Sequence, residues 1–115
     1  MELRFKNAAV ADLRSFIRHY EDAFFELYRD SGVWSEDAII DNMRQSAQKL
    51  FDDIFTHIET HLGHARVLGR KKARDGWHEL CFNVGTRLVI VYFSEEGRKT
   101  RWIESISIDR KPIIF

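Results

Sequence analysis

Residues 75–93 are rich in apolar side chains, but one histidine and one arginine lie within this segment and further basic residues lie on either side of it. His78 and Arg87 stand nine positions apart in it, and Arg110 and Lys111 follow the next apolar run. A guanidinium group binds phosphate oxygens through several N–H donors, and an imidazole can transfer a proton near neutral pH. Converging cations also stabilise charge that develops on a phosphate during reaction. These residue types therefore predict a site for a phosphodiester.

A second group of cations comes just before this segment, in a probable loop. Arg70, Lys71, Lys72 and Arg74 are the candidates for contacts with a nucleic-acid backbone, and Arg66 precedes them. Phosphate contacts of this kind dominate the affinity of proteins for nucleic acids. The alternative interpretation is a solvated charged loop without a ligand.

The net charge of zero conceals an uneven distribution along the chain. Residues 1–63 hold 7 Lys/Arg and 12 Asp/Glu, whereas residues 64–115 hold 11 Lys/Arg and 6 Asp/Glu. Such a division indicates an anionic partner for the basic half. The alternative is that the two halves attract each other within one fold.

Three histidines near the middle of the chain raise the question of a metal. His57 and His61 are four residues apart, so they share one helix face and could chelate zinc. However, Ile58 stands where a zinc-protease motif has glutamate, and no clear further ligand follows. We therefore expect no metal and no other cofactor.

The first half of the chain predicts one strand and two helices. Residues 2–6 alternate polar and apolar side chains, which is typical of a short strand. A helix should follow, with Asn7 as its N-cap and Gly32 after its end. A second helix should begin after the N-cap Ser35 and end at Gly63. The short link between the helices predicts an antiparallel pair.

The second half predicts three strands. Residues 77–82, 86–93 and 100–108 are rich in β-branched and aromatic side chains. Turns are expected at 83–85 and 94–99, so the strands should be antiparallel, with 86–93 in the centre. The predicted fold is α+β with the order β-α-α-β-β-β. Two long antiparallel helices should pack on a small antiparallel sheet.

A chain of 115 residues is the size of one domain, so residues 1–115 are treated as one unit. The single cysteine, Cys81, cannot form an internal disulfide, which favours a reducing compartment. No apolar run reaches the roughly 18 residues that cross a bilayer, and charged residues interrupt the N-terminal segment. A cytoplasmic protein that does not enter a membrane is expected.

Two stretches of the second half resemble the RelE/ParE superfamily, the toxins of bacterial type II toxin–antitoxin systems. They are GWHELCFNVGTRLVIVYF and WIESISIDRKPIIF. Members of the superfamily typically have a Gly-aromatic-Arg-aliphatic strand, which is similar to residues 85–90 here. They also have a basic pair after the last strand, which Arg110 and Lys111 match. The expected order of elements agrees with the superfamily as well.

The resemblance implies a toxin that a cognate antitoxin protein neutralises. RelE-like members are endoribonucleases that cut mRNA, often on the ribosome, without a metal. They use the 2′-OH of the RNA as the nucleophile. Carried over by position, Arg87 and Arg110 would stabilise the phosphate together with Lys111, and His78 would transfer a proton. Phe115 would take the place of the C-terminal tyrosine that stacks on the substrate base in RelE.

Other functions on the same fold are left open by the sequence. ParE-like members lack the ribonuclease residues and inhibit DNA gyrase by binding to it. Here Thr86 replaces the usual aromatic residue before the strand arginine, and several lysines of efficient ribonucleases are missing. An inhibitor of gyrase or of another protein target is therefore the alternative, as is a non-catalytic interaction module.

Overall fold

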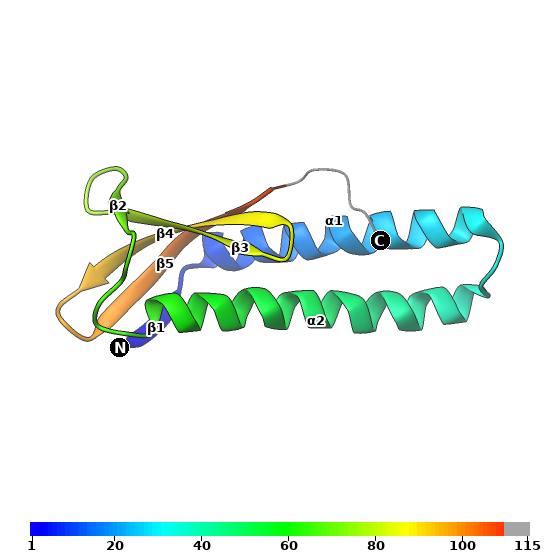
Figure 1. The fold of residues 1–115 in the computed structure, drawn as a ribbon, viewed down its shortest axis with the longest axis horizontal. Helices are drawn as coiled ribbons and strands as arrows, with labels where there is room; N and C mark the ends of the chain where they lie inside the picture. Colours follow the sequence, from blue (N-terminus) through cyan, green and yellow to red (C-terminus); the bar gives the residue numbers. More distant parts are fainter. Residues whose placement is uncertain (110–115) are drawn as a thin grey trace.

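The computed structural model describes residues 1–109 as an elongated molecule with a sheet at one end. It measures 54 × 22 × 22 Å, and its radius of gyration is 16.3 Å. A compact chain of this length would have a radius of gyration of about 13 Å. The difference arises because two long helices form a hairpin that extends well past the sheet (Figure 1).

The two helices are α1 (Asn7–Ser31) and α2 (Glu36–Leu62). The side chain of Ser35 accepts a hydrogen bond from the backbone N–H of Ala38, which confirms Ser35 as the N-cap of α2. The expected N-cap of α1 was wrong. Asn7 is already helical, and the capping position belongs to Lys6, which makes no side-chain capping bond.

The five strands form one mixed sheet in the order β1-β5-β4-β3-β2. Their bounds are β1 (Glu2–Phe5), β2 (Lys71–Lys72), β3 (His78–Val84), β4 (Arg87–Glu96) and β5 (Thr100–Ile108). β1 pairs with β5 in parallel, and the other neighbours are antiparallel. The α+β class and the β-α-α-β-β-β layout are thus confirmed, with β4 in the centre. The two-residue edge strand β2 is an addition.

The connection between β3 and β4 is shorter than the sequence predicted. β3 continues to Val84, which pairs with Arg87, so only Gly85 and Thr86 form the turn. Gly85 has a φ of 63°, a conformation that side chains with a Cβ seldom adopt. The expected turn at residues 83–85 was therefore wrong, because Asn83 and Val84 belong to the strand ladder.

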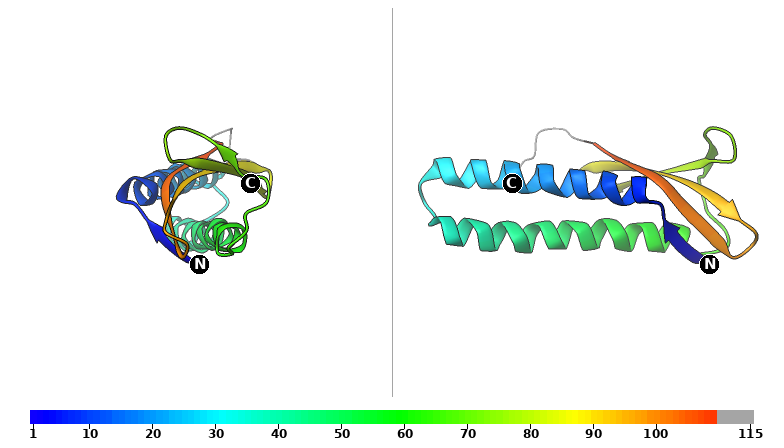
Figure 2. Two further views of the ribbon diagram at one scale, coloured as in Figure 1. Left: turned by 90° about the vertical axis from the view of Figure 1, so that its left-hand side faces the viewer. Right: turned by 180° about the vertical axis from the view of Figure 1, so that it is seen from behind.

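The main core lies between one face of the sheet and the near halves of the helices (Figure 2). Its helical members begin at Ala9 and end at Ile17 on α1, and they run from Leu50 to Leu62 on α2. The opposite face of the sheet is not covered by a helix (Figure 2). No helix within residues 1–109 contains a stretch apolar enough to cross a membrane.

β1 pairs only with the first part of β5, and α1 covers the remaining open edge of β5. One carboxylate oxygen of Asp12 accepts a hydrogen bond from the backbone N–H of Ile106 at 2.9 Å. The same oxygen accepts a second bond from the hydroxyl of Ser105 at 2.8 Å. An edge strand presents unpaired N–H groups, so this carboxylate satisfies one where the sheet has no further strand.

The outer part of the hairpin, residues 19–43, is here called the arm. It lies beyond the helical residues that pack on the sheet, and Phe24 and Ile39 are buried between its two helices. At its tip Tyr28 stacks on Trp34, with ring centroids 4.4 Å apart and an interplanar angle of 5°. Phe24 and Tyr28 are also in contact, at 4.7 Å. The arm is thus held together by its own small aromatic cluster.

Candidate nucleic-acid interface

Arg87 is held in place at the start of β4, on the face of the sheet that carries the helices. Its Nη1 donates a hydrogen bond to the backbone oxygen of Asp109 at 2.7 Å. Its guanidinium carbon lies 5.2 Å from the centroid of the Phe16 ring on α1. A planar cation fixed by a carbonyl and an aromatic face is well suited to bind a phosphate, since little rotamer freedom remains to be lost.

Tyr20 lies in the electrostatic field of Arg87, although it was not among the site residues expected from the sequence. Burial raises the pKa of the Tyr20 hydroxyl, and a hydrogen bond with Ser46 and the charge of Arg87 only partly offset this rise. The hydroxyl is therefore protonated at neutral pH. It can donate a hydrogen bond or a proton, but it is a poor base.

His78 does not lie near Arg87. His78 begins β3, where it pairs with Phe93 and stacks on its ring at a centroid distance of 5.5 Å. Arg87 pairs with Val84 at the other end of the same strand. Six residues of β-strand separate these ends by about 20 Å. The expectation that the two side chains act on one phosphate is thus corrected, because antiparallel strands begin at opposite ends of the sheet.

The three remaining C-terminal candidates, Arg110, Lys111 and Phe115, lie outside the described residues. The structure does place Asp109 beside the beginning of β4, since its backbone N–H donates to the oxygen of Leu88 at 3.0 Å. The chain therefore leaves β5 next to Arg87, as the antiparallel order predicted.

Arg70 has a structural partner. Its Nη1 lies 2.7 Å from one carboxylate oxygen of Glu95, and the other oxygen accepts a hydrogen bond from Nε of Arg101 at 3.1 Å. Burial raises the pKa of the Glu95 carboxyl, but the hydrogen bond and charge of Arg70, together with Arg101, outweigh it and lower the pKa below its usual value. Arg70 thus serves an ion pair first, and its availability to a nucleic acid is reduced.

Arg101 is fully buried and closes the end of α2. Its Nη1 donates to the backbone oxygens of Leu62, at 2.8 Å, and His64, and its Nη2 donates to that of Ala65 at 2.7 Å. The last carbonyls of a helix lack intrahelical partners, so this guanidinium caps α2. Together with Glu95, Arg101 also fixes the loop that leads from α2 to residues 70–74.

The other candidates for contacts with a nucleic-acid backbone, Lys71, Lys72 and Arg74, are exposed. Lys71 and Lys72 form the edge strand β2, opposite Glu79 and His78 of β3. The guanidinium of Arg74 lies 4.5 Å from the ring centroid of Trp77. The structure therefore brings this candidate group together at one end of the sheet, about one strand length from Arg87.

Aromatic side chains lie near or on the uncovered sheet face. Trp77 and Tyr92 have ring centroids 6.4 Å apart and are both half-buried. Across the sheet, the amino group of Lys6 lies 4.3 Å from the Trp102 ring centroid. Proteins that bind single-stranded nucleic acids use such features: aromatic rings on a sheet stack on bases, and nearby cations contact the phosphate backbone.

The paired histidines of α2 pack on the sheet. His57 and His61 stack on the ring of Phe82, with centroid distances of 5.9 and 4.9 Å. Nδ1 of His57 lies 2.7 Å from the backbone oxygen of Asp53 and must donate to it. Across residues 1–109, no group of three or more His, Cys, Asp or Glu is arranged to hold a metal ion.

We compared the chain with protein-family models, with curated proteins and with solved structures, and none of the three comparisons gave a match. The chemistry of the described residues and the resemblance of the strands therefore remain as the basis for a function.

Proposed function

We propose that the chain is the toxin of a type II toxin–antitoxin system and acts as an endoribonuclease on mRNA. The observation that carries this proposal is the fixed position of Arg87. Its guanidinium is held by Asp109 and Phe16 at the point where β5 ends, in the strand that resembles the RelE-like arginine strand. A cation held in advance can stabilise the charge of a phosphate in the transition state without reorganisation.

In the proposed reaction the 2′-OH of the RNA attacks the adjacent phosphorus atom. The bond to the 5′ oxygen of the next nucleotide breaks, which leaves a 2′,3′-cyclic phosphate and a 5′-hydroxyl end. The 2′-OH gives up its proton to solvent water, and the leaving oxygen must receive a proton from a donor that solvent then reprotonates. The Tyr20 hydroxyl, which is protonated at neutral pH and lies within the field of Arg87, is the donor that we assign to this step. His78 is too far from Arg87 to take part.

We further propose that the RNA strand crosses the uncovered face of the sheet. Lys71, Lys72 and Arg74 would bind phosphates at one end, and Trp77 and Tyr92 would stack with bases. The strand would then turn around the end of the sheet where β4 begins and reach Arg87 on the face that carries the helices. We propose that the protein acts in the cytoplasm. The cognate antitoxin would cover the basic surface formed by Lys71, Lys72 and Arg74.

A second candidate function is favoured by the separation of His78 from Arg87. It leaves the strand arginine without the histidine that RNA cleavage was expected to use. A ParE-like inhibitor needs no proton transfer, since it acts by binding DNA gyrase or another protein. This candidate predicts growth arrest with intact RNA.

Pulsed expression in bacteria with mapping of mRNA 5′ ends separates the two. The ribonuclease proposal predicts growth arrest and new 5′ ends with the wild type and with His78→Ala. Both should vanish with Arg87→Ala, and Tyr20→Phe should cut more slowly. Arg44→Ala, which alters an exposed arginine of α2, is the matched control and should behave as the wild type.

Each outcome decides between the candidates once circular dichroism shows that all variants are folded. Arrest without new 5′ ends would reject the ribonuclease and support the inhibitor. Absence of arrest would reject both and leave a non-catalytic interaction module.

A further inference from the structure

The arm is strongly acidic. Residues 19–43 contain seven Asp/Glu and one Arg, a net charge of −6. The other basic residues of the hairpin beyond the main core, Arg18, Arg44 and Lys49, lie nearer to the sheet. The acidic residues of the arm are Glu21, Asp22, Glu26, Asp30, Glu36, Asp37 and Asp41.

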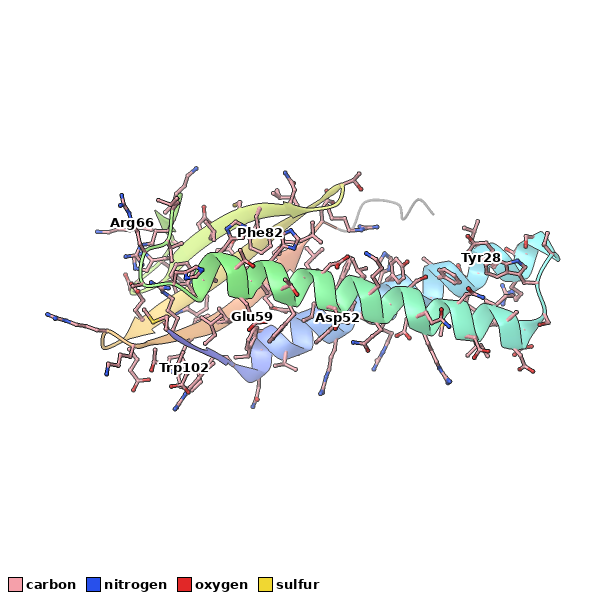
Figure 3. All side chains as sticks on the ribbon, turned by 60° about the horizontal axis from the view of Figure 1, so that its bottom comes forward. Tyr28, Asp52, Glu59, Arg66, Phe82 and Trp102 are labelled. Atoms are coloured by element: carbon pink, nitrogen blue, oxygen red, sulfur yellow. The ribbon has the colours of Figure 1, made fainter. Side chains whose placement is uncertain are left out.

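The opposite end of the molecule is basic. Residues 64–75, here called the basic end, contain five Lys/Arg and one Asp, a net charge of +4. The nearby turn between β4 and β5 adds Arg98 and Lys99, which are exposed. Figure 3 shows Arg66 of the basic end and Tyr28 of the arm at the two ends of the long axis.

These two regions cannot attract each other within one molecule. The long axis is 54 Å, whereas the electrostatic interaction of exposed charges is screened over about 8 to 10 Å at physiological salt. The alternative that the two halves of the chain neutralise each other inside one fold is therefore wrong for the arm. Its charge is available to another molecule.

We propose that the arm binds the basic end of a second copy of this chain in an antiparallel dimer. Two molecules that lie side by side in opposite directions place each arm beside the basic end of the other. This arrangement forms both contacts at once and closes around a two-fold axis, the commonest symmetry of protein dimers. End-to-end contact would form one contact per junction and would not close.

The arm also offers apolar surface to such a partner. Leu27, Val33 and Trp34 are 49%, 78% and 37% exposed, although all three are large apolar residues. A shallow groove between the helices has Phe25, Ile40 and Met43 among its lining residues. Acidic side chains line the same groove, together with Arg29: Glu21, Asp22, Glu26 and Glu36. An apolar groove with a charged rim is typical of a protein interface and adds hydrophobic contact to the charge attraction.

The dimer would cover part of the surface that we assign to RNA. An RNA strand and the arm of the second copy would then compete for Lys71 and Lys72. This consequence rests on the proposed function, but the dimer itself does not, since it is measured without RNA.

Sedimentation of the purified chain tests the dimer directly. At about 50 mM NaCl we expect a species of twice the 13.6 kDa mass of one chain. Its dissociation constant should rise at least tenfold at about 500 mM NaCl, because the salt screens both charge contacts. A monomer at every concentration in low salt would overturn the proposal.

Charge reversal tests where the contact lies. The arm variant is Glu21→Lys, Asp22→Lys and Glu26→Lys, and the basic-end variant is Lys71→Glu, Lys72→Glu and Arg74→Glu. Each variant alone should be monomeric, because the changes bring the net charge of the arm from −6 to 0 and that of the basic end from +4 to −2. Neither variant then keeps an arm and a basic end of opposite sign. A mixture of the two should form a heterodimer, since the unchanged basic end of one variant (+4) meets the unchanged arm of the other (−6), and the three new lysines meet the three new glutamates.

A matched control separates the arm from a general effect of net charge. Asp52→Lys, Asp53→Lys and Glu59→Lys make the same change of net charge on α2 outside the arm. This variant should dimerise as the wild type does and should not pair with the basic-end variant more tightly than the wild type does. Equal loss of dimer in the arm variant and this control would overturn the proposal, as would a mixture that stays monomeric.

Discussion

Replacement of Arg101 by methionine should be the most destabilising single change in the described structure outside the apolar core. Arg101 is 0% exposed, and it donates hydrogen bonds to three backbone oxygens and to Glu95. Methionine fills a similar volume but donates nothing. The substitution therefore removes the cap of α2 and one of the two cations that hold Glu95.

The size of the effect follows from these contacts. The carbonyls of His64 and Ala65 belong to exposed residues and can regain water, whereas Leu62 is buried. Loss of one partner of a buried charged network costs about 3 to 5 kcal/mol. Since domains are stable by about 5 to 15 kcal/mol, Arg101→Met should lose much of its free energy of unfolding.

Urea unfolding followed by tryptophan fluorescence and circular dichroism measures this loss. With a urea dependence of about 1 to 3 kcal/mol per M, the midpoint should fall by about 2 M. Arg98→Met, which alters an exposed arginine three positions earlier, is the control and should change the free energy of unfolding by less than about 0.5 kcal/mol. A loss below about 1 kcal/mol for Arg101→Met would refute the view that this guanidinium closes the helix.

Three further predictions concern the fold. Asp12→Ala leaves the N–H of Ile106 without its acceptor, and urea unfolding should show a loss of about 1 to 3 kcal/mol. Thermal unfolding of Ser35→Ala should show a loss of about 1 kcal/mol, the usual value of an N-cap; Ser35→Asp should retain most of it. The ion pair with Arg70 lowers the pKa of Glu95, so this carboxylate stabilises the fold above the pKa of an unfolded glutamate. That contribution should vanish as the pH falls through the lowered pKa, and Glu95→Gln should show a smaller acid-induced drop in stability than the wild type.

Most of the fold could be predicted because its elements carry regular patterns. Apolar residues at helical spacing predicted both helices, and the N-cap Ser35 predicted where α2 begins. β2 could not be predicted, since two charged residues carry no periodicity, and its existence depends on pairing with Glu79 and His78. The parallel pairing of β1 with β5 is likewise set by the position of the helices between them, which no local pattern records.

The candidate site was predicted less well, for two physical reasons. Neighbouring antiparallel strands begin at opposite ends of the sheet, so His78 and Arg87, which each begin a strand, lie far apart. Residue type also says nothing about a partner that is distant in the chain. Arg70 resembled a free cation until its ion pair with Glu95 was seen, and Tyr20 had no visible link to the strand arginine.

The central claim is that Arg87 promotes cleavage of RNA through the 2′-OH, and the chemistry of the new ends tests it most directly. A translating bacterial extract can be supplied with a reporter mRNA, a chelator that leaves translation intact, and purified wild type or Arg87→Ala. The account predicts cuts with 5′-hydroxyl and 2′,3′-cyclic phosphate ends that only the wild type produces and that 2′-O-methylation of the cut nucleotide prevents. Intact mRNA, or cuts that Arg87→Ala produces equally well, would contradict it.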